Sequence, residues 1–153
     1  MTNGIKDGYY KEITPAGFGI AIKAGKVLVS KQTKFQKLDI FETESSLGRV
    51  LTLDDLMMTT EGDEYHYHEM IAHVPMMHHK CPKTLLVIGG GDGGTVREVL
   101  KHDTVEKVVL CEIDGDVSES CTVIFDEYGY HAQENDSSEN SSLFDELFKG
   151  GDK

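Results

Sequence analysis

The chain has 153 residues and a formal net charge of -12, enough sequence for one domain or for one small domain and part of another. Because nucleic-acid binding needs clustered lysine and arginine, this acidic balance argues against a nucleic-acid partner. No apolar run reaches the roughly 18 residues of a membrane span, and the first ten residues contain no signal-peptide core. The three cysteines form no C-x-x-C pair, which fits free thiols in a reducing compartment, so we expect a cytoplasmic protein without a membrane partner.

Residues 1–60 are predicted to form an N-terminal domain of β-strands. From Phe18 to Thr60, short runs of β-prone residues alternate with turn residues. The connecting turns are expected at residues 24–26 and 45–48. This pattern is typical of antiparallel hairpins and predicts a small antiparallel sheet.

An amphipathic helix is expected after Thr60, which together with Asp63 resembles a capping box. Pro75 is expected to end the helix. The predicted buried face consists of four residues at the spacing i, i+3, i+4, i+7: Tyr67, Met70, Ile71 and Val74.

The stretch "LLVIGGGDGGTVREVL" predicts a buried strand, a tight turn and a helix that reaches about His102. Its glycines satisfy G-x-G-x-x-G at Gly89, Gly91 and Gly94. A second apolar strand at residues 108–111 would complete a right-handed crossover with parallel strands. The predicted fold class is therefore α/β: a small N-terminal antiparallel β-sheet domain, followed in residues 61–117 by the first β-α-β part of a Rossmann-like domain.

The sequence changes character after Val117. Residues 118–153 are strongly acidic, and the stretch "HAQENDSSENSS" is polar and has no periodicity. We therefore expect residues 118–153 to form a divergent, disordered loop or tail.

Two carboxylates accompany the glycine loop and indicate the kind of ligand. In a dinucleotide site the loop amides and the helix N-terminus receive a pyrophosphate. Asp92 would bring a negative charge into that position, which disfavours an NAD-dependent dehydrogenase. Glu112, at the tip of the next strand, could accept both ribose hydroxyls of a nucleoside. Together they favour an adenosyl ligand that carries a positive group, although Asp92 could instead cap the following helix and Glu112 could be a solvated strand end.

The histidine-rich stretch "HYHEMIAH" invites a metal interpretation. A zincin helix needs two histidines four residues apart. His68 and His73 are five apart, about 140° around the helix, so no metal site is predicted. No nucleophile motif is present either.

Three stretches closely resemble the spermidine synthase family, the polyamine aminopropyltransferases: "KFQKLDIFET", "LDDLMMTTEGDEYHYHEMIAHVP" and "VIGGGDGGTVREVLKHDTVEKVVLCEIDGDV". The resemblance runs from about Tyr9 to Val117. It implies an N-terminal β-strand domain, a methyltransferase-type Rossmann-like domain and a homo-oligomer. It also implies transfer of an aminopropyl group from decarboxylated S-adenosylmethionine, as co-substrate, to putrescine, with no metal and no other cofactor.

The same resemblance assigns residues to the two ligands. The donor nucleoside would be bound by Gln36, Gly89, Gly91 and Glu112. The polyamine would be bound by Tyr67, His68 and Asp92.

The chain also departs from the family pattern. Asp55 stands where the family usually has glycine, and Tyr10 where an aromatic residue, often tryptophan, is usual. After Val117 we do not find the family's adenine-contacting motif or its catalytic-base loop, so no catalytic residue is assigned. Two hypotheses remain open: an aminopropyltransferase, or a non-catalytic nucleoside-binding or oligomerisation module of the same family.

Overall fold

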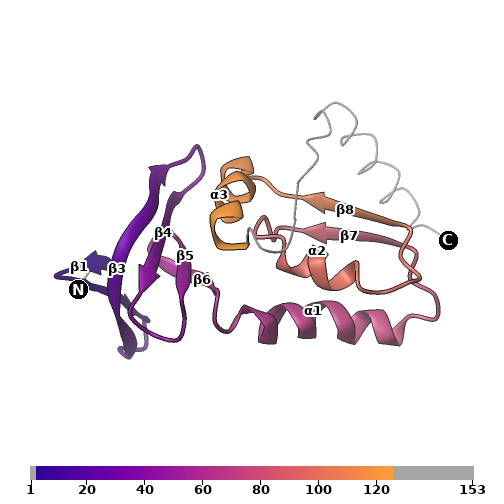
Figure 1. The fold of residues 1–153 in the computed structure, drawn as a ribbon, viewed down its shortest axis with the longest axis horizontal. Helices are drawn as coiled ribbons and strands as arrows, with labels where there is room; N and C mark the ends of the chain where they lie inside the picture. Colours follow the sequence, from indigo (N-terminus) through magenta and orange to yellow (C-terminus); the bar gives the residue numbers. More distant parts are fainter. Residues whose placement is uncertain (1–2, 126–153) are drawn as a thin grey trace.

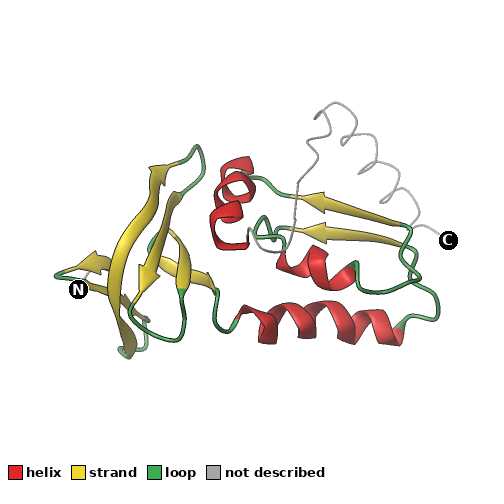
Figure 2. Ribbon diagram, viewed as in Figure 1, coloured by secondary structure: helices red, strands yellow, loops and turns green. Residues whose placement is uncertain are grey.

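The computed structural model describes residues 3–125. Figure 1 shows two parts, with a long helix that runs along the second, and Figure 2 shows that strands make up nearly all of the first part. Within the described residues the first part is a six-stranded antiparallel sheet in the order β1-β2-β3-β4-β5-β6. Its strands are β1 (Gly4–Lys6), β2 (Tyr9–Ile13), β3 (Gly19–Gln32), β4 (Lys37–Thr43), β5 (Arg49–Leu53) and β6 (Leu56–Thr60). The predicted N-terminal antiparallel sheet is confirmed.

The first half of this sheet differs in detail from the prediction. Strands β1 and β2 precede the region in which strands were expected. The turn expected at residues 24–26 is wrong, because β3 continues through it as a single strand of 14 residues. Instead of a turn, the register with β4 shifts between Ala24 and Val27 and again between Val27 and Val29. Such irregularities bend a strand without ending it. Gly25 therefore lies within β3 and does not mark a turn.

The hairpin turns contain the backbone strain of this region. The turn at residues 45–48 is confirmed, and its Gly48 has φ 67°. Asp54 and Asp55 connect β5 to β6 with φ values of 50° and 61°, the left-handed conformation that favours glycine at both central positions of a hairpin. Asp54 Oδ1 accepts a hydrogen bond from the backbone N–H of Lys37, and Asp55 pairs with the Lys37 ammonium at 2.7 Å. These contacts hold Asp54 and Asp55 in a conformation that otherwise favours glycine.

Strand β4 places apolar side chains on both faces of the sheet. One face carries a cluster formed by Tyr10, Phe41 and Val50, all fully buried. The Tyr10 hydroxyl donates to Glu12 at 2.6 Å. The other face carries a second cluster, which joins the sheet to helix α3 (Gly115–Phe125): Leu38, Ile40, Leu51, Val117, Cys121 and Ile124.

Helix α3 changes the predicted end of the ordered chain. The expected boundary after Val117 lies inside this helix, and residues 118–125 are helical rather than part of a tail. Cys121 and Ile124 belong to the apolar core, which explains why the segment folds despite its polar neighbours. The rest of the predicted tail, residues 126–153, lies outside the described residues.

The second part contains the predicted β-α-β unit, which is confirmed. Strand β7 (Thr84–Ile88) pairs in parallel with β8 (Lys107–Cys111), and α2 (Gly94–Val99) connects them. Helix α2 ends at Val99, short of the expected His102. The strands are only partly buried, and Ile88 is 70% exposed, whereas a buried strand was expected.

Helix α1 (Glu64–His78) lies alongside α2 (Figure 1). Its predicted buried face is wrong, because Tyr67 and Met70 are more than 60% exposed and Ile71 and Val74 are 44% exposed. The residues that α1 buries are Glu64, His68, Ala72 and Met76. The physical reason is that α1 meets α2 largely through paired charges, which the spacing of apolar residues does not report.

Both predicted ends of α1 also need correction. Pro75 lies inside the helix, which continues to His78. The Thr60 hydroxyl donates to the Asp63 side chain at 2.5 Å, but Asp63 makes no side-chain capping bond, so no capping box forms.

Among the helices of residues 3–125, none combines the length and the apolar character needed to cross a bilayer.

Candidate functional site

The glycine loop between β7 and α2 is the central segment of the candidate site. Gly89, Gly90 and Gly93 have φ values of 75°, 80° and 82°, which side chains disfavour sterically. The N–H of Gly93 donates to the carbonyl of Gly90 at 3.0 Å and closes the turn. This tight turn carries Asp92 at the start of α2 and directs its side chain toward α1.

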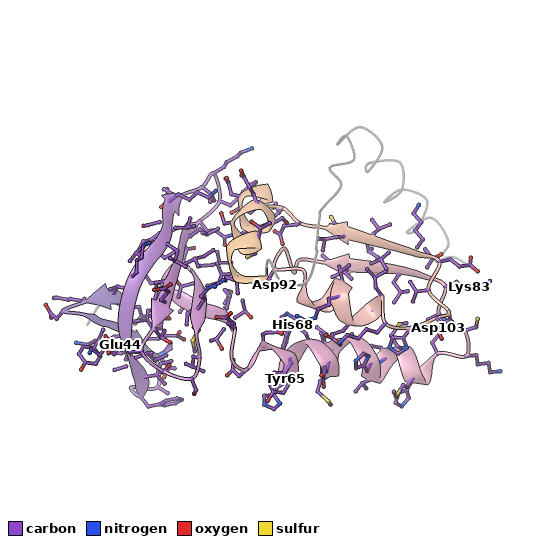
Figure 3. The ribbon with its side chains drawn as sticks, viewed as in Figure 1. Glu44, Tyr65, His68, Lys83, Asp92 and Asp103 are labelled. Carbon is purple, nitrogen blue, oxygen red and sulfur yellow. The ribbon has the colours of Figure 1, made fainter. Side chains whose placement is uncertain are left out.

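Asp92 is held from two sides. Its Oδ1 accepts the backbone N–H of Gly94 at 2.9 Å and lies 3.3 Å from Nε2 of His68. Figure 3 shows the two labelled side chains close to one another between α1 and the loop. The N-cap of α2 is Gly93, and no N-cap side chain bonds to this helix. Asp92 precedes the N-cap, and it bonds to the first residue of the helix and to His68 on α1.

Gly94 is required for the approach of His68. A Cβ placed at Gly94 would lie 2.4 Å from ring atoms of His68, a distance that Cβ atoms essentially never show. The third glycine of the motif thus allows α1 to pack against the start of α2 with an imidazole between them. His68 is 2% exposed as a result.

A second carboxylate faces the other side of the His68 ring. Glu64 Oε2 lies 2.5 Å from His68 Nδ1, one helical turn away on α1. Both Glu64 oxygens also accept from the Arg97 guanidinium on α2, each at 2.9 Å. The buried imidazole is therefore between two carboxylates, one of which is fixed by an arginine.

This arrangement changes the pKa of both members of the His68–Asp92 pair. Burial by itself disfavours the charged imidazole, but the Asp92 and Glu64 carboxylates outweigh burial and raise the pKa of His68 above its usual value. Burial likewise opposes ionisation of Asp92, but His68, the Gly94 amide and the Arg97 charge outweigh it and lower the pKa of Asp92. Both pKa shifts thus favour an imidazolium paired with a carboxylate.

Glu112 lies at the opposite end of the same loop, at the tip of β8. Its Oε2 accepts the N–H of Gly91 at 2.9 Å, and its Oε1 accepts the N–H of Asp114 at 3.0 Å. A Cβ at Gly91 would lie 3.0 Å from Glu112 Cγ, so the second glycine lets the carboxylate lie against the loop. Glu112 is half-buried and held in place, rather than a free side chain at a strand end.

Gln36 approaches this end of the site from the N-terminal sheet. Its side-chain amide donates to Asp114 Oδ2 at 2.9 Å, and the Thr33 hydroxyl donates to the same oxygen at 2.8 Å. Asp114 is 2% exposed. Because Asp114 also donates its N–H to Glu112, the predicted residues Gln36 and Glu112 share this aspartate as a neighbour.

The structure therefore arranges the predicted site residues in two groups. Glu112 contacts Gly91, while Gln36 reaches the same end through Asp114. At the other end, His68 contacts Asp92, and the Tyr67 ring lies edge-on to His68 with ring centroids 5.4 Å apart. Tyr67 is 64% exposed, so its expected place in the helix core is wrong.

Sequence reasoning missed three residues that support the site: Glu64, Arg97 and Asp114. Glu64 precedes His68 by four residues, a spacing that places both on one helix face. Asp114 follows Glu112 by two residues in "EIDGD". Arg97 carried no local signal, because its partner Glu64 is 33 residues away in sequence.

The histidines of α1 have separate environments. His73 Nδ1 lies 2.9 Å from His102 Nε2, and His73 Nε2 lies 3.2 Å from Glu98, whereas His68 faces Asp92. In residues 3–125 no group of three or more histidine, cysteine or acidic side chains is arranged to hold a metal ion.

Sequence models of two protein families match the chain. The "Spermidine synthase tetramerisation domain" matches residues 8–61, and the "Spermine/spermidine synthase domain" matches residues 64–140. The second match extends to residue 140, past Val117, where the resemblance was expected to end.

Curated relatives are similar over part of their length. The polyamine aminopropyltransferase of Thermotoga maritima is 54% identical over 112 residues, which are 73% of this chain and 38% of that protein. The polyamine aminopropyltransferase of Leptospira biflexa is 60% identical over 98 residues, 64% of this chain and 34% of that protein. The chain thus spans less than half the length of these relatives.

Two solved structures of spermidine synthases are also similar to this chain over part of their length. The crystal structure of spermidine synthase from Thermotoga maritima has a TM-score of 0.75 and 47% sequence identity, and the likeness covers 84% of this chain and 45% of that one. A spermidine synthase in complex with the transition state analogue AdoDATO matches with the same TM-score and identity, over 84% of this chain and 44% of that one. These neighbours support the Rossmann-like class of the second part.

Proposed function

Because the chain belongs to the spermine/spermidine synthase family, we propose that its glycine-loop site serves aminopropyl transfer. The donor is decarboxylated S-adenosylmethionine, the acceptor is putrescine, and the products are spermidine and methylthioadenosine. The donor is a co-substrate, and the proposal includes no further cofactor and no metal. The free thiols of Cys81, Cys111 and Cys121 support a reducing compartment, and we propose the cytoplasm.

The observation that carries this proposal is the pair of carboxylates at the two ends of one glycine loop. Glu112 is held by the Gly91 and Asp114 amides, and a carboxylate there can accept ribose hydroxyls. Asp92 is held through Oδ1 by the Gly94 amide, which leaves Oδ2 for a ligand. A pyrophosphate would meet two negative charges in this loop, whereas a donor with a sulfonium and an ammonium is attracted by them.

The proposed chemistry is one displacement. The acceptor amine attacks the aminopropyl carbon next to sulfur, the carbon–sulfur bond breaks, and its electron pair neutralises the sulfonium. The attacking nitrogen must lose a proton, and we assign no general base among residues 3–125. The described residues contribute binding and alignment of the donor, which can account for a large part of a rate enhancement.

Calorimetric titration tests the two carboxylates separately. Asp92→Asn is expected to weaken decarboxylated S-adenosylmethionine by about 10- to 100-fold, the usual range for a hydrogen bond to a charged group, and to spare methylthioadenosine, which has no ammonium. Glu112→Gln is expected to weaken both ligands. Asp103→Asn, which changes an exposed carboxylate, is the matched control. NAD binding more tightly than either nucleoside would overturn the proposal.

A chromatographic assay of the chain with both substrates separates the two hypotheses that the sequence left open. Formation of spermidine supports the aminopropyltransferase. Binding of methylthioadenosine without any spermidine would favour a non-catalytic nucleoside-binding module instead.

We also propose that the chain forms a homo-oligomer through its N-terminal sheet. Residues 8–61 match a tetramerisation domain, and that sheet exposes apolar side chains at Phe18, Ile20 and Val27. Light scattering at micromolar concentration is expected to give a mass that is a multiple of 17.0 kDa. A monomer mass would contradict this.

A further inference from the structure

His68 is a titratable group buried between two carboxylates. Its Nδ1 lies 2.5 Å from Glu64 and its Nε2 lies 3.3 Å from Asp92, and its side chain is 2% exposed. An imidazolium donates from both nitrogens, whereas a neutral imidazole donates from only one. The charge of this ring therefore determines whether His68 can donate to Glu64 and Asp92 at the same time, in addition to the Gly94 amide that donates to Asp92 in either case.

Other charged groups around the ring act through these two carboxylates. Arg97 binds Glu64 and also donates to Glu98 at 2.8 Å, and Glu98 accepts from the exposed Lys101 at 2.5 Å. A chain of alternating charges thus runs from the surface to Asp92: Lys101, Glu98, Arg97, Glu64, His68 and Asp92. On the α3 side lie Glu112 and Cys121, and burial together with Asp92 and Glu112 raises the pKa of the Cys121 thiol to about 12, so this thiol stays neutral.

We propose that an ammonium group binding beside Asp92 displaces a proton from His68, so that the site exchanges one cation for another. The pair of Asp92 and protonated His68 has no net charge. An ammonium that binds Oδ2 would lie close to the imidazolium on the same carboxylate, and two like charges at such distances in a buried site repel strongly. Loss of the imidazole proton removes this repulsion.

The geometry indicates which proton leaves. Nδ1–H remains as a donor to Glu64, whose charge Arg97 fixes in place. The Nε2 proton is the one that faces Asp92, and it passes to solvent. The ammonium then replaces it as the donor to Asp92, and the bare Nε2 can accept a further ammonium proton. The charge of the buried site is the same before and after binding.

This inference rests on the proposed function for the identity of the ligand, an ammonium-bearing nucleoside. By linkage, a proton released on binding makes the affinity for that ligand increase with pH. We therefore expect decarboxylated S-adenosylmethionine to bind more tightly as the pH rises through the range in which His68 titrates. Methylthioadenosine, which has no ammonium, should show no such dependence.

The experiment measures proton release directly. The midpoint of His68 titration is first located by NMR of the free protein. Binding of each nucleoside is then titrated calorimetrically, below that midpoint, in buffers of different ionisation enthalpy, and the slope of the observed enthalpy gives the number of protons released. We expect release approaching one proton for decarboxylated S-adenosylmethionine and none for methylthioadenosine.

Variants assign the proton to His68. Glu64→Gln removes one of the two carboxylates, so His68 should titrate at lower pH and proton release should be lost at the pH used for the wild type. Glu69→Gln changes an exposed glutamate of the same helix and should behave as the wild type. His68→Gln, which has no titrating group, should bind the donor without releasing a proton, even if Glu64→Gln fails to fold.

The possible outcomes distinguish this inference from the proposed function. If decarboxylated S-adenosylmethionine does not bind at all, the proposed function fails. If it binds without proton release from the wild-type chain, or with the same release from His68→Gln, the cation exchange is overturned while the proposed function stands.

Discussion

The N-terminal sheet and the contact between α1 and α2 are both well buried, but they are built from different side chains. In the sheet, the fully buried residues include Phe41, Ile40 and Val50. Between the helices, His68 and Glu98 are equally inaccessible at 2% and 1% and lie beside the buried Ala72 and Met76, while most of the large apolar residues of α1 face outward. The sheet therefore relies on apolar contact, whereas the helix contact relies largely on paired charges.

This difference is instructive because the two kinds of contact constrain geometry differently. Hydrophobic burial has no direction and tolerates small shifts of the side chains. Paired charges stabilise a buried contact only when hydrogen bonds satisfy them in a specific geometry. The helix contact thus fixes the orientation of Asp92 relative to His68, and the sheet supplies most of the apolar core.

The largest effect is expected from truncating the apolar core. Phe41→Ala should reduce the free energy of unfolding by about 3–5 kcal/mol, because it removes a fully buried ring and leaves a cavity. Met77→Ala, at a 78% exposed position, should cost less than about 0.5 kcal/mol. Denaturant unfolding measures both, and equal losses would contradict the assignment of the core.

Breaking the charge network should cost nearly as much. Arg97→Met removes an ion-pair partner shared by Glu64 and Glu98 and should reduce the free energy of unfolding by about 3 kcal/mol, since each buried carboxylate loses a charge that compensates it. Adding Glu64→Gln to this variant should recover part of the loss, because one of those carboxylates becomes neutral. If the double variant were less stable than the single one, Glu64 would not depend on Arg97.

A smaller loss is expected where the loop meets α1. Gly94→Ala should cost about 1–3 kcal/mol, the range for overpacking, because the added Cβ would collide with the His68 ring. Gly115→Ala at the start of α3 is the control, since nothing lies within 4 Å of a Cβ there. Thermal unfolding of the two variants compares them. Equal stability would show that His68 moves aside freely.

The smallest effect is a dependence of stability on pH. The pKa of His68 is raised, so its contribution is complete below 6.5, its usual value, and is lost as the pH rises through the folded pKa. The pKa of Asp92 is lowered, so its contribution is complete above 3.8, its usual value, and is lost as the pH falls through the folded pKa. Both contribute fully between pH 3.8 and 6.5. The difference in unfolding free energy between wild type and His68→Gln should be largest in that window, and a difference that grows above it would refute the pairing.

Much of the second part could be predicted from sequence because its signals are local. The apolar strand, the glycine turn and the start of α2 are consecutive, and steric limits on φ require glycine at this turn. The positions of Asp92 and Glu112 follow directly from this order of elements, because Asp92 lies inside the loop and Glu112 at the end of the next strand. The face of α1 could not be predicted in the same way, because its apolar spacing indicated the wrong side.

The sequence by itself determined the antiparallel sheet, the β-α-β unit and the two carboxylates of the loop, since each depends on residues close together in the chain. Only the tertiary structure decided which face of α1 is buried, because Glu64 meets Arg97 across 33 residues. The same holds for Asp114, whose partners Gln36 and Thr33 are 78 and 81 residues away. Hydrogen bonds between charged groups leave no periodic pattern in the sequence. They can therefore be identified only from the way in which the helices and strands that carry these groups pack together.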